Sequence, residues 1–298
     1  MADPIGKIIL RSARQVFIWP LEAAIVLLIF SVARLLPVAA ASAAMSAVIG
    51  VIGPITPWQK RARRNLHLAM PELDTAAQNH VLAGMWRNFG HVIGEFPHVH
   101  HMPDDGRIEF AGLEHLENIN EGAFLIGAHI GNWELGPYAA INAGHKVAAI
   151  YRPLNNPLLA GLLARRQANY GGDIFRKGRE GALGMISALR KGQIMCLLVD
   201  QQLREGMEVP FFGHPAQTSI GHIKLAIKKK VPLMLMRTQR IEGCRFKVTI
   251  SPPLDLPARD NDREVLAIAT QINAQIEDWI KSAPDQWFWP HRRWGKNI

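Results

Sequence analysis

The chain has only two cysteines among its 298 residues, Cys196 and Cys244. Both lie in apolar, strand-like runs, and no Cys/His spacing typical of a zinc site is present. Reduced core thiols therefore fit this pattern better than a disulfide does, and they suit a cytoplasmic domain. The chain also lacks an RNP-like aromatic strand and any other nucleic-acid motif, so we expect no nucleic-acid partner.

Charge is nearly missing from residues 16–59. Leu35 to Gln59 carries none, and Val16 to Ala33 carries only Glu22. A membrane-spanning helix needs about 20 apolar residues, so each half of this segment is borderline. Prolines at positions 20, 37, 54 and 57 interrupt it. The apolar stretch is too long for a secretory signal peptide, and it has no clear cleavage site.

Basic residues flank this apolar segment on both sides. They are Lys7, Arg11 and Arg14 before it, and Lys60, Arg61, Arg63 and Arg64 after it. The positive-inside rule favours the cytoplasm for both clusters, which a single span cannot satisfy. We therefore expect residues 1–59 to form a membrane-associating helical segment that lies in the interface or dips in and returns. The alternative is a buried helical hairpin of a soluble protein.

The remaining residues, 60–298, are predicted to form the catalytic domain, because apolar strands alternate with amphipathic helices from Thr75 onward. The predicted helices are 76–92, 135–143, 157–170, 181–191, 220–229 and 262–281; the predicted strands are 107–110, 123–128, 146–151, 193–199, 231–236 and 246–250. Alternation of this kind predicts an α/β fold, with a mixed, mainly parallel sheet covered by helices. The formal charge of +9 suits an anionic membrane or an acidic carrier protein.

One short run stands out, His129-Ile130-Gly131-Asn132-Trp133-Glu134. It follows the strand predicted at 123–128 and precedes a predicted helix, so the histidine sits at the carboxyl end of a strand, where reactive groups gather in α/β sheets. A catalytic histidine needs a carboxylate to orient it, and the intervening turn allows Glu134 to fold back onto the imidazole. No serine or cysteine is adjacent, so the nucleophile is expected to be a substrate hydroxyl.

Further polar clusters follow the other predicted strands. Tyr151-Arg152-Pro153 ends one, Phe175-Arg176-Lys177-Gly178 follows another, and Asp200-Gln201-Gln202 ends a third. An arginine at such a position can hold a phosphate through two parallel hydrogen bonds. Each arginine alone could equally be a solvated surface charge.

These blocks, in this order, resemble the late acyltransferases of lipid A biosynthesis, the lauroyl/myristoyl acyltransferases. The resemblance covers nearly the whole chain. It is carried by residues 64–66, 70–72, 127–134, 151–155, 175–176, 200–201, 210–213, 286–289 and 291–294. It implies a fold like that of the glycerolipid acyltransferases and a bacterial inner-membrane location, with the catalytic domain on the cytoplasmic face.

The resemblance also implies a reaction. A fatty acyl chain is transferred from acyl carrier protein to a hydroxyl of a lipid A precursor, an anionic glycolipid, without a metal or tightly bound cofactor. Relatives in the family acylate other glycolipids, so the acceptor does not follow from the motif.

The residue roles that we expect are specific. His129 is the general base, Glu134 orients it, and backbone N–H groups around Gly131 and Asn132 are candidate oxyanion donors. Asn132, Arg152, Arg176 and Asp200 are the predicted substrate-binding residues. The two arginines would contact headgroup phosphates or the carrier's phosphopantetheine, and Asp200 would hold an arginine or a sugar hydroxyl.

Three other interpretations remain open. The chain could acylate another glycolipid, hydrolyse the thioester with water, or bind a membrane or carrier without catalysis. A histidine-rich stretch, His98, His100 and His101 near Asp104 and Asp105, fits no common metal site. Trp287, Trp289 and Trp294 suit either a membrane-interface edge or the core.

Overall fold

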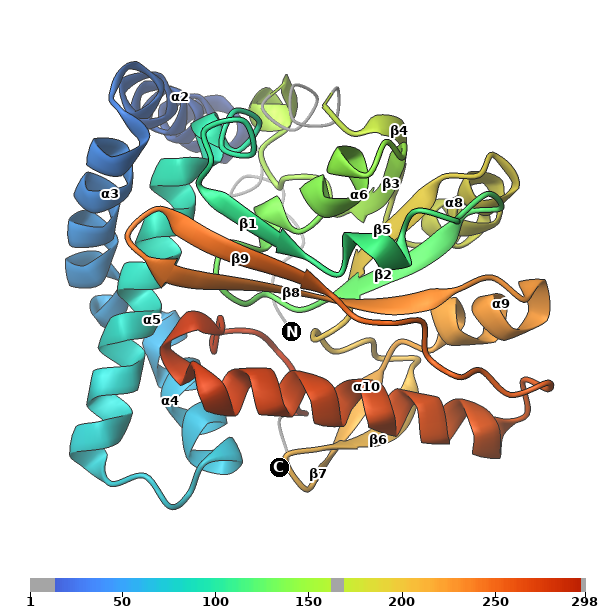
Figure 1. Ribbon diagram of the computed structural model, residues 1–298. Helices are drawn as coiled ribbons and strands as arrows, with labels where there is room; N and C mark the ends of the chain where they lie inside the picture. Colours follow the sequence, from blue (N-terminus) through green and yellow to red (C-terminus); the bar gives the residue numbers. More distant parts are fainter. Residues whose placement is uncertain (1–13, 162–168, 296–298) are drawn as a thin grey trace.

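The structure is a computed structural model that describes residues 14–161 and 169–295. Its centre is a seven-stranded sheet with the order β1-β9-β8-β2-β5-β3-β4 (Figure 1). The strands are β1 (Ile108–Ala111), β2 (Ala123–Gly127), β3 (Val147–Tyr151), β4 (Gly171–Arg176), β5 (Ile194–Leu198), β8 (Leu233–Glu242) and β9 (Arg245–Ile250). Only the β8–β9 pairing is antiparallel, so the predicted mixed, mainly parallel sheet is confirmed.

Helices cover both faces of this sheet. They are α2 (Trp19–Leu35), α3 (Val38–Ile52), α4 (Pro57–Ala69), α5 (Thr75–Glu95), α6 (Tyr138–Asn142), α8 (Arg179–Arg190), α9 (Gly221–Lys229) and α10 (Asp262–Ser282). All of β2 is buried, as expected for a central strand covered on both sides. Because its side chains alternate, Phe124 joins the core beneath α5, α9 and α10, and Leu125 joins the core beneath α6.

Local sequence explains where the long helices begin. The Asp74 side chain caps α5 by accepting a hydrogen bond from the Ala77 N–H at 2.7 Å. Asn261 caps α10 in the same way. Val265, Ile268 and Ile272 form a buried stripe on α10, which runs along one side of the sheet as the red helix of Figure 1. Burying each such side chain contributes roughly 2 kcal/mol.

The apolar N-terminal segment forms α2 and α3, which are separated at Pro37. The stretches Gln15–Leu35 and Val38–Ile55 are each long and apolar enough to cross a bilayer, and only 11% and 28% of them is buried. The α3 helix packs along α5, where Gly90 and Gly94 leave room for its backbone. The opposite surfaces carry exposed apolar side chains, which is compatible with membrane association. Lys7 and Arg11 of the first basic cluster lie outside the described residues.

Some elements differ from the sequence-based expectation. The helix predicted at 135–143 is a 3₁₀ turn, Trp133–Leu135, followed by the short α6, because Gly136-Pro137 interrupts it. The helix predicted at 157–170 lies partly outside the described residues; its first turn is 3₁₀, Pro157–Leu159. A hairpin of β6 (Met207–Phe211) and β7 (His214–Thr218) was not predicted. Gly243 forms the β8–β9 turn, with a φ of 50°.

Candidate active site

His129 lies just beyond the carboxyl end of β2, where the chain turns sharply. Gly131 has a φ of 60°, and a Cβ atom there would meet the Thr238 carbonyl oxygen, so the turn requires glycine. The C-terminal segment holds this turn in place. Phe288 N–H donates to the His129 carbonyl at 3.1 Å, and Ile130 forms an isolated antiparallel bridge with Trp287. The C-terminal segment therefore fixes the backbone of His129 and Ile130.

The carboxylate that orients His129 comes from Asp200. Because β5 lies beside β2 in the sheet, the residues just beyond the two strands meet. His129 Nδ1 lies 2.7 Å from Asp200 Oδ1, and the His129 backbone N–H donates to Oδ2 at 2.9 Å. From the sequence, Glu134 was expected to orient His129, and Asp200 was expected to contact the substrate. In the structure, the carboxylate bonded to His129 is that of Asp200. The reason is that strand adjacency brings residues together across 71 positions of chain.

Asp200 is anchored as a charged, buried group. Trp287 Nε1–H donates to Oδ2 at 2.8 Å, and the Asp200 side chain is fully buried. Burial alone would raise the pKa of Asp200. The charge and hydrogen bonds of His129 outweigh burial and hold the pKa well below its ordinary value. An ionised Asp200 places the His129 proton on Nδ1, which leaves Nε2 free to accept one.

Nε2 of His129 faces a partly open surface. The Gln201 amide nitrogen lies 3.3 Å from it, Gln201 is exposed, and the His129 side chain keeps 16% of its surface accessible. The His291 ring lies 4.3 Å from the His129 ring, centre to centre. Burial, and then the His129 charge, lower the pKa of His291 to about 3, so His291 stays neutral beside the base.

Three half-buried aromatic rings adjoin this open side. Trp133 packs edge-on to His129 at 5.2 Å between ring centres, and Phe89 stacks on Trp133. Phe288 contacts both Phe89 and His291. The reactive nitrogen is therefore flanked by apolar surface, which suits an acyl chain better than it suits a polar substrate.

Glu134 is buried within the motif. Its Oε1 accepts a hydrogen bond from Trp133 Nε1 at 3.0 Å, and its backbone N–H donates to Asn132 Oδ1 at 3.2 Å. Since Trp133 packs on His129, Glu134 is placed to hold the ring that lies against the base. Its catalytic role stays a prediction.

Asn132 faces the interior of the protein. Its side chain is fully buried, its amide nitrogen donates to Glu95 Oε2 at 2.8 Å, and its oxygen caps Glu134. This arrangement replaces the predicted substrate contact with a structural one. Gly131 N–H donates to the Gln286 carbonyl at 3.0 Å, so the prediction that it stabilises an oxyanion is wrong.

Arg152 and Arg176 lie at the same sheet edge as His129, but at a distance from it. Arg152 follows β3 and Arg176 ends β4, which are two and three strands away from β2. At the usual strand spacing these are separations of roughly 10 and 14 Å. Both side chains are exposed, and Tyr151, by a hydrogen bond and then its charge, raises the pKa of Arg176. They can reach a large substrate but not the reacting atoms.

One group of side chains within the described residues could in principle hold a metal ion: His129, Asp200 and His291, whose donor atoms lie within 4.8 Å of one another. Both Asp200 oxygens already accept hydrogen bonds from His129 and Trp287. A metal would have to displace these donors, so the geometry fits an acid–base pair better than a metal centre.

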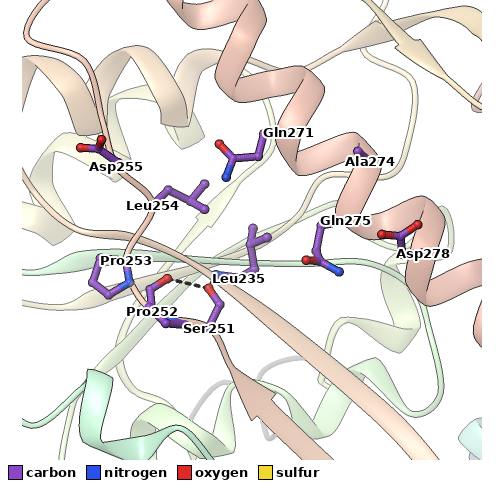
Figure 2. A pocket seen from close by; sticks show the side chains of 10 residues that line it. All are labelled: Leu235, Ser251, Pro252, Pro253, Leu254, Asp255, Gln271, Ala274, Gln275 and Asp278. Carbon is purple, nitrogen blue, oxygen red and sulfur yellow. Dashed lines mark hydrogen bonds between the residues drawn. The ribbon is translucent and has the colours of Figure 1, made fainter.

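A separate pocket lies between α10 and the segment after β9, lined by residues such as Leu235, Ser251, Gln271 and Asp278 (Figure 2). The Ser251 hydroxyl accepts from Leu235 N–H and donates to the Pro252 carbonyl, so it is not an available nucleophile. None of the residues around His129 lines this pocket. The candidate catalytic residues therefore lie at the carboxyl edge of the sheet and not in this pocket.

Sequence reasoning did not predict that Trp287 and His291 contribute to the site. Each reaches the site from the far end of the chain, and only their place in the blocks at 286–289 and 291–294 marked the region. The three tryptophans are core residues, with at most 2% of their surface exposed. Cys196 and Cys244 are free and buried, as expected.

Comparison with known proteins finds relatives that are named as acyltransferases. The palmitoleoyltransferase of lipid A biosynthesis from Escherichia coli (strain K12) is 26% identical over 242 residues, 78% of this chain and 77% of its own length. The lauroyltransferase of lipid A biosynthesis from the same organism is 28% identical over 245 residues, 78% of each chain. A phosphatidylinositol mannoside acyltransferase from Mycobacterium tuberculosis (strain H37Rv) is 25% identical over 190 residues, 61% of this chain and 58% of its own.

A family description covers far more of the sequence than any single motif does. The family of bacterial lipid A biosynthesis acyltransferases matches residues 10–296, which include the N-terminal helices, the whole sheet and the C-terminal segment around Trp287. The protein is thus a member of the bacterial lipid A biosynthesis acyltransferase family.

Proposed function

We propose that this protein transfers a fatty acyl chain from the thioester of acyl carrier protein to a hydroxyl of a lipid A precursor. The observation that carries the proposal is the pair of His129 and a buried, ionised Asp200, joined at 2.7 Å, with Nε2 directed to a partly open, aromatic-lined surface. No cofactor takes part in the step, because the proton and the acyl group move between protein and substrates alone.

The first half of the reaction needs a base. His129 Nε2 takes the proton from the acceptor hydroxyl as its oxygen attacks the thioester carbonyl carbon. The positive imidazolium that forms is stabilised by Asp200, which is held ready by Trp287. Positioned general bases of this kind typically contribute about 10²–10⁴-fold in rate.

The second half needs an acid. As the tetrahedral intermediate collapses, the C–S bond breaks and the His129 proton passes to the departing thiolate. The new ester and the free carrier thiol leave, and His129 returns to its neutral state. Glu134, through its hydrogen bond to Trp133, keeps the adjoining ring in place during both halves.

The surface of the molecule supports a location for the protein. The exposed apolar faces of α2 and α3 support association with the bacterial inner membrane, and the basic residues on α4 support placement of the catalytic domain on the cytoplasmic face. Arg152 and Arg176 would contact anionic groups at the outer part of a substrate, either headgroup phosphates or the carrier's phosphopantetheine.

A second candidate acceptor comes from the mannoside acyltransferase relative, since a family member named for a different glycolipid shares 25% of its residues over the matched region. An acylated phosphatidylinositol mannoside would then be the product. Thioester hydrolysis, with water in place of the hydroxyl, is a third outcome that the same base permits.

The test is an acyl transfer assay with purified protein. Acyl carrier proteins with chains of several lengths are mixed with a tetra-acylated lipid A precursor, and products are read by mass spectrometry. We expect the acceptor mass to rise by one acyl group with the wild type. His129→Ala should lose at least 100-fold in rate while keeping its unfolding midpoint. His80→Ala, an exposed histidine on α5, is the matched control.

The alternatives give different products in the same assay. Free fatty acid without acceptor gain would identify a hydrolase. Gain on phosphatidylinositol mannoside but not on the lipid A precursor would move the acceptor. Unchanged turnover in His129→Ala would overturn the mechanism.

A further inference from the structure

Three arginines converge on one short stretch of the C-terminal segment. Arg61 and Arg64 lie one turn apart on α4, so their side chains share a face of that helix. Arg61 Nη1 donates to the Pro290 carbonyl, and Arg64 Nη2 donates to the Gly295 carbonyl, each at 3.2 Å. Arg292 lies in the chain between these two acceptors and is exposed.

No carboxylate neutralises this cluster within residues 14–161 and 169–295. Neither Arg61, Arg64 nor Arg292 forms an ion pair there, whereas nearby Arg63 points elsewhere, to Asn79 at 2.8 Å. Burial, followed by the charges of Arg292 and Arg64, lowers the pKa of Arg61. Like charges gathered without a counter-charge favour binding of an anion.

The cluster is tied to the catalytic base by direct contacts. Asn65, which lies beside Arg64 on α4, donates to the carbonyls of Trp289 and His291 at 2.8 and 2.7 Å. The His291 ring in turn lies 4.3 Å from that of His129. A ligand held by the arginines is thus anchored to the same segment that packs against the base.

The residues that precede Arg61 in the chain indicate the side from which a ligand approaches the three arginines. Val51, Ile55 and Trp58, at the junction of α3 and α4, are 73%, 81% and 52% exposed. Large exposed apolar side chains directly before a row of arginines are typical of a membrane interface. In Figure 1 this junction lies at the same side of the molecule as α2 and α3. The anion that fits is a headgroup phosphate of a lipid that stays in the membrane.

We propose that Arg61, Arg64 and Arg292 form a phosphate-binding site for the glycolipid acceptor. The inference rests on the proposed function, because it assumes that an anionic glycolipid supplies the hydroxyl. Arginine suits this task, since its planar guanidinium binds phosphate oxygens through two parallel hydrogen bonds. The site would set which acceptor hydroxyl reaches His129 Nε2, and the donor would bind elsewhere.

The test separates acceptor from donor. Arg61→Gln, Arg292→Gln and the double variant are assayed at varied acceptor and at varied carrier-bound donor. We expect KM for the acceptor to rise roughly 10-fold in each single variant and roughly 100-fold in the double variant, with KM for the donor within 2-fold. Arg263→Gln, an exposed arginine on the first turn of α10 without an ion pair, is the matched control.

A dephosphorylated acceptor supplies the decisive comparison. With wild type, removal of the phosphate should raise the acceptor KM as much as the double variant does, and the variants should show no further loss on that acceptor. Equal losses on both acceptors would overturn the proposal. A rise in the donor KM would overturn it too, because it would assign the cluster to the carrier.

Binding without turnover keeps this test independent of the proposed reaction. His129→Ala is mixed with zwitterionic vesicles with and without phosphorylated glycolipid, and the binding considered is the gain that the glycolipid produces in co-sedimentation, because α2 and α3 can bind either kind of vesicle. Binding that the additional change Arg292→Gln abolishes supports the site, even if no acyl transfer is found. Binding that both proteins share equally contradicts it. Unfolding midpoints within about 2 °C of wild type show that the variants are folded.

Discussion

Two buried carboxylates lie against the same loop at residues 129–134, and they are built differently. Asp200 holds His129, whose Nε2 stays available on a partly open side. Glu95 holds Arg240, which stays charged and is buried on all sides. In the His129–Asp200 pair, Nε2 of His129 can accept a proton. The Glu95–Arg240 pair has no such site.

The Glu95–Arg240 pair is fully satisfied. Arg240 donates to both Glu95 oxygens, to Asn88 Oδ1 at 3.0 Å and to the Gly243 carbonyl at 2.7 Å. Glu95 also accepts from Ser42 of α3 and from Asn132 of the motif. The pair therefore joins α3, the sheet and the loop at residues 129–134, and its role is to hold these parts together. The comparison shows that the catalytic pair keeps Nε2 of His129 on a partly open surface beside the exposed Gln201, whereas the polar atoms of the scaffold pair bond inside the protein.

The largest expected effect concerns Asp200. Asp200→Asn keeps the shape but removes the charge that stabilises the imidazolium, so we expect kcat to fall by about 10²–10⁴-fold. The unfolding free energy should change much less than kcat does. The measurement is kcat for acyl transfer from pH 5 to 9, together with urea unfolding.

Glu134→Gln is the paired variant, because the sequence favoured Glu134 as the orienting carboxylate. A milder loss than in Asp200→Asn is expected, since Glu134 acts through Trp133. If Glu134→Gln were the more damaging of the two, the assignment of Asp200 would be reversed.

The second effect concerns the scaffold pair. Glu95→Gln leaves Arg240 as a buried charge without its counter-charge, so we expect a loss of about 3–5 kcal/mol in unfolding free energy. Activity per folded molecule should fall less than in Asp200→Asn, and its pH profile should keep its shape. Urea unfolding and active-site-normalised rates test this. Glu109→Gln, an exposed partner of Lys247, is the control; a similar loss there would remove the distinction.

The smallest expected effect concerns His222, a buried histidine that forms no ion pair with a carboxylate in the described part of the chain. His222 on α9 is buried against Phe124, and burial lowers its pKa to about 4. Its folded-state pKa is below the unfolded value of about 6.5, so the unfolded chain binds more protons as pH falls below 6.5. His222 should therefore cost about 1 kcal/mol of stability at pH 6 and about 3 kcal/mol at pH 4.

His291, with a pKa of about 3, acts over the same range. His222→Phe should thus reduce the slope of unfolding free energy against pH by about half rather than remove it. Chemical unfolding at four pH values from 4 to 7 measures the slope. An unchanged slope would contradict the assignment of a neutral, buried His222.

The sequence by itself determined the fold class, the place of His129 and the family. Buried strands of apolar residues and capped amphipathic helices are encoded locally, so β2, α5 and α10 were predictable within a few residues. The turn at Gly131 is local too, because its φ of 60° favours glycine.

Only the tertiary structure decided which groups meet. Asp200 reaches His129 because β5 lies beside β2, and Trp287 reaches Asp200 because the C-terminal segment bridges to Ile130. Ser42, Glu95, Asn132 and Arg240 converge from four elements spread over about two hundred residues. Strand order and helix docking depend on the packing of the whole core, so no local pattern encodes them.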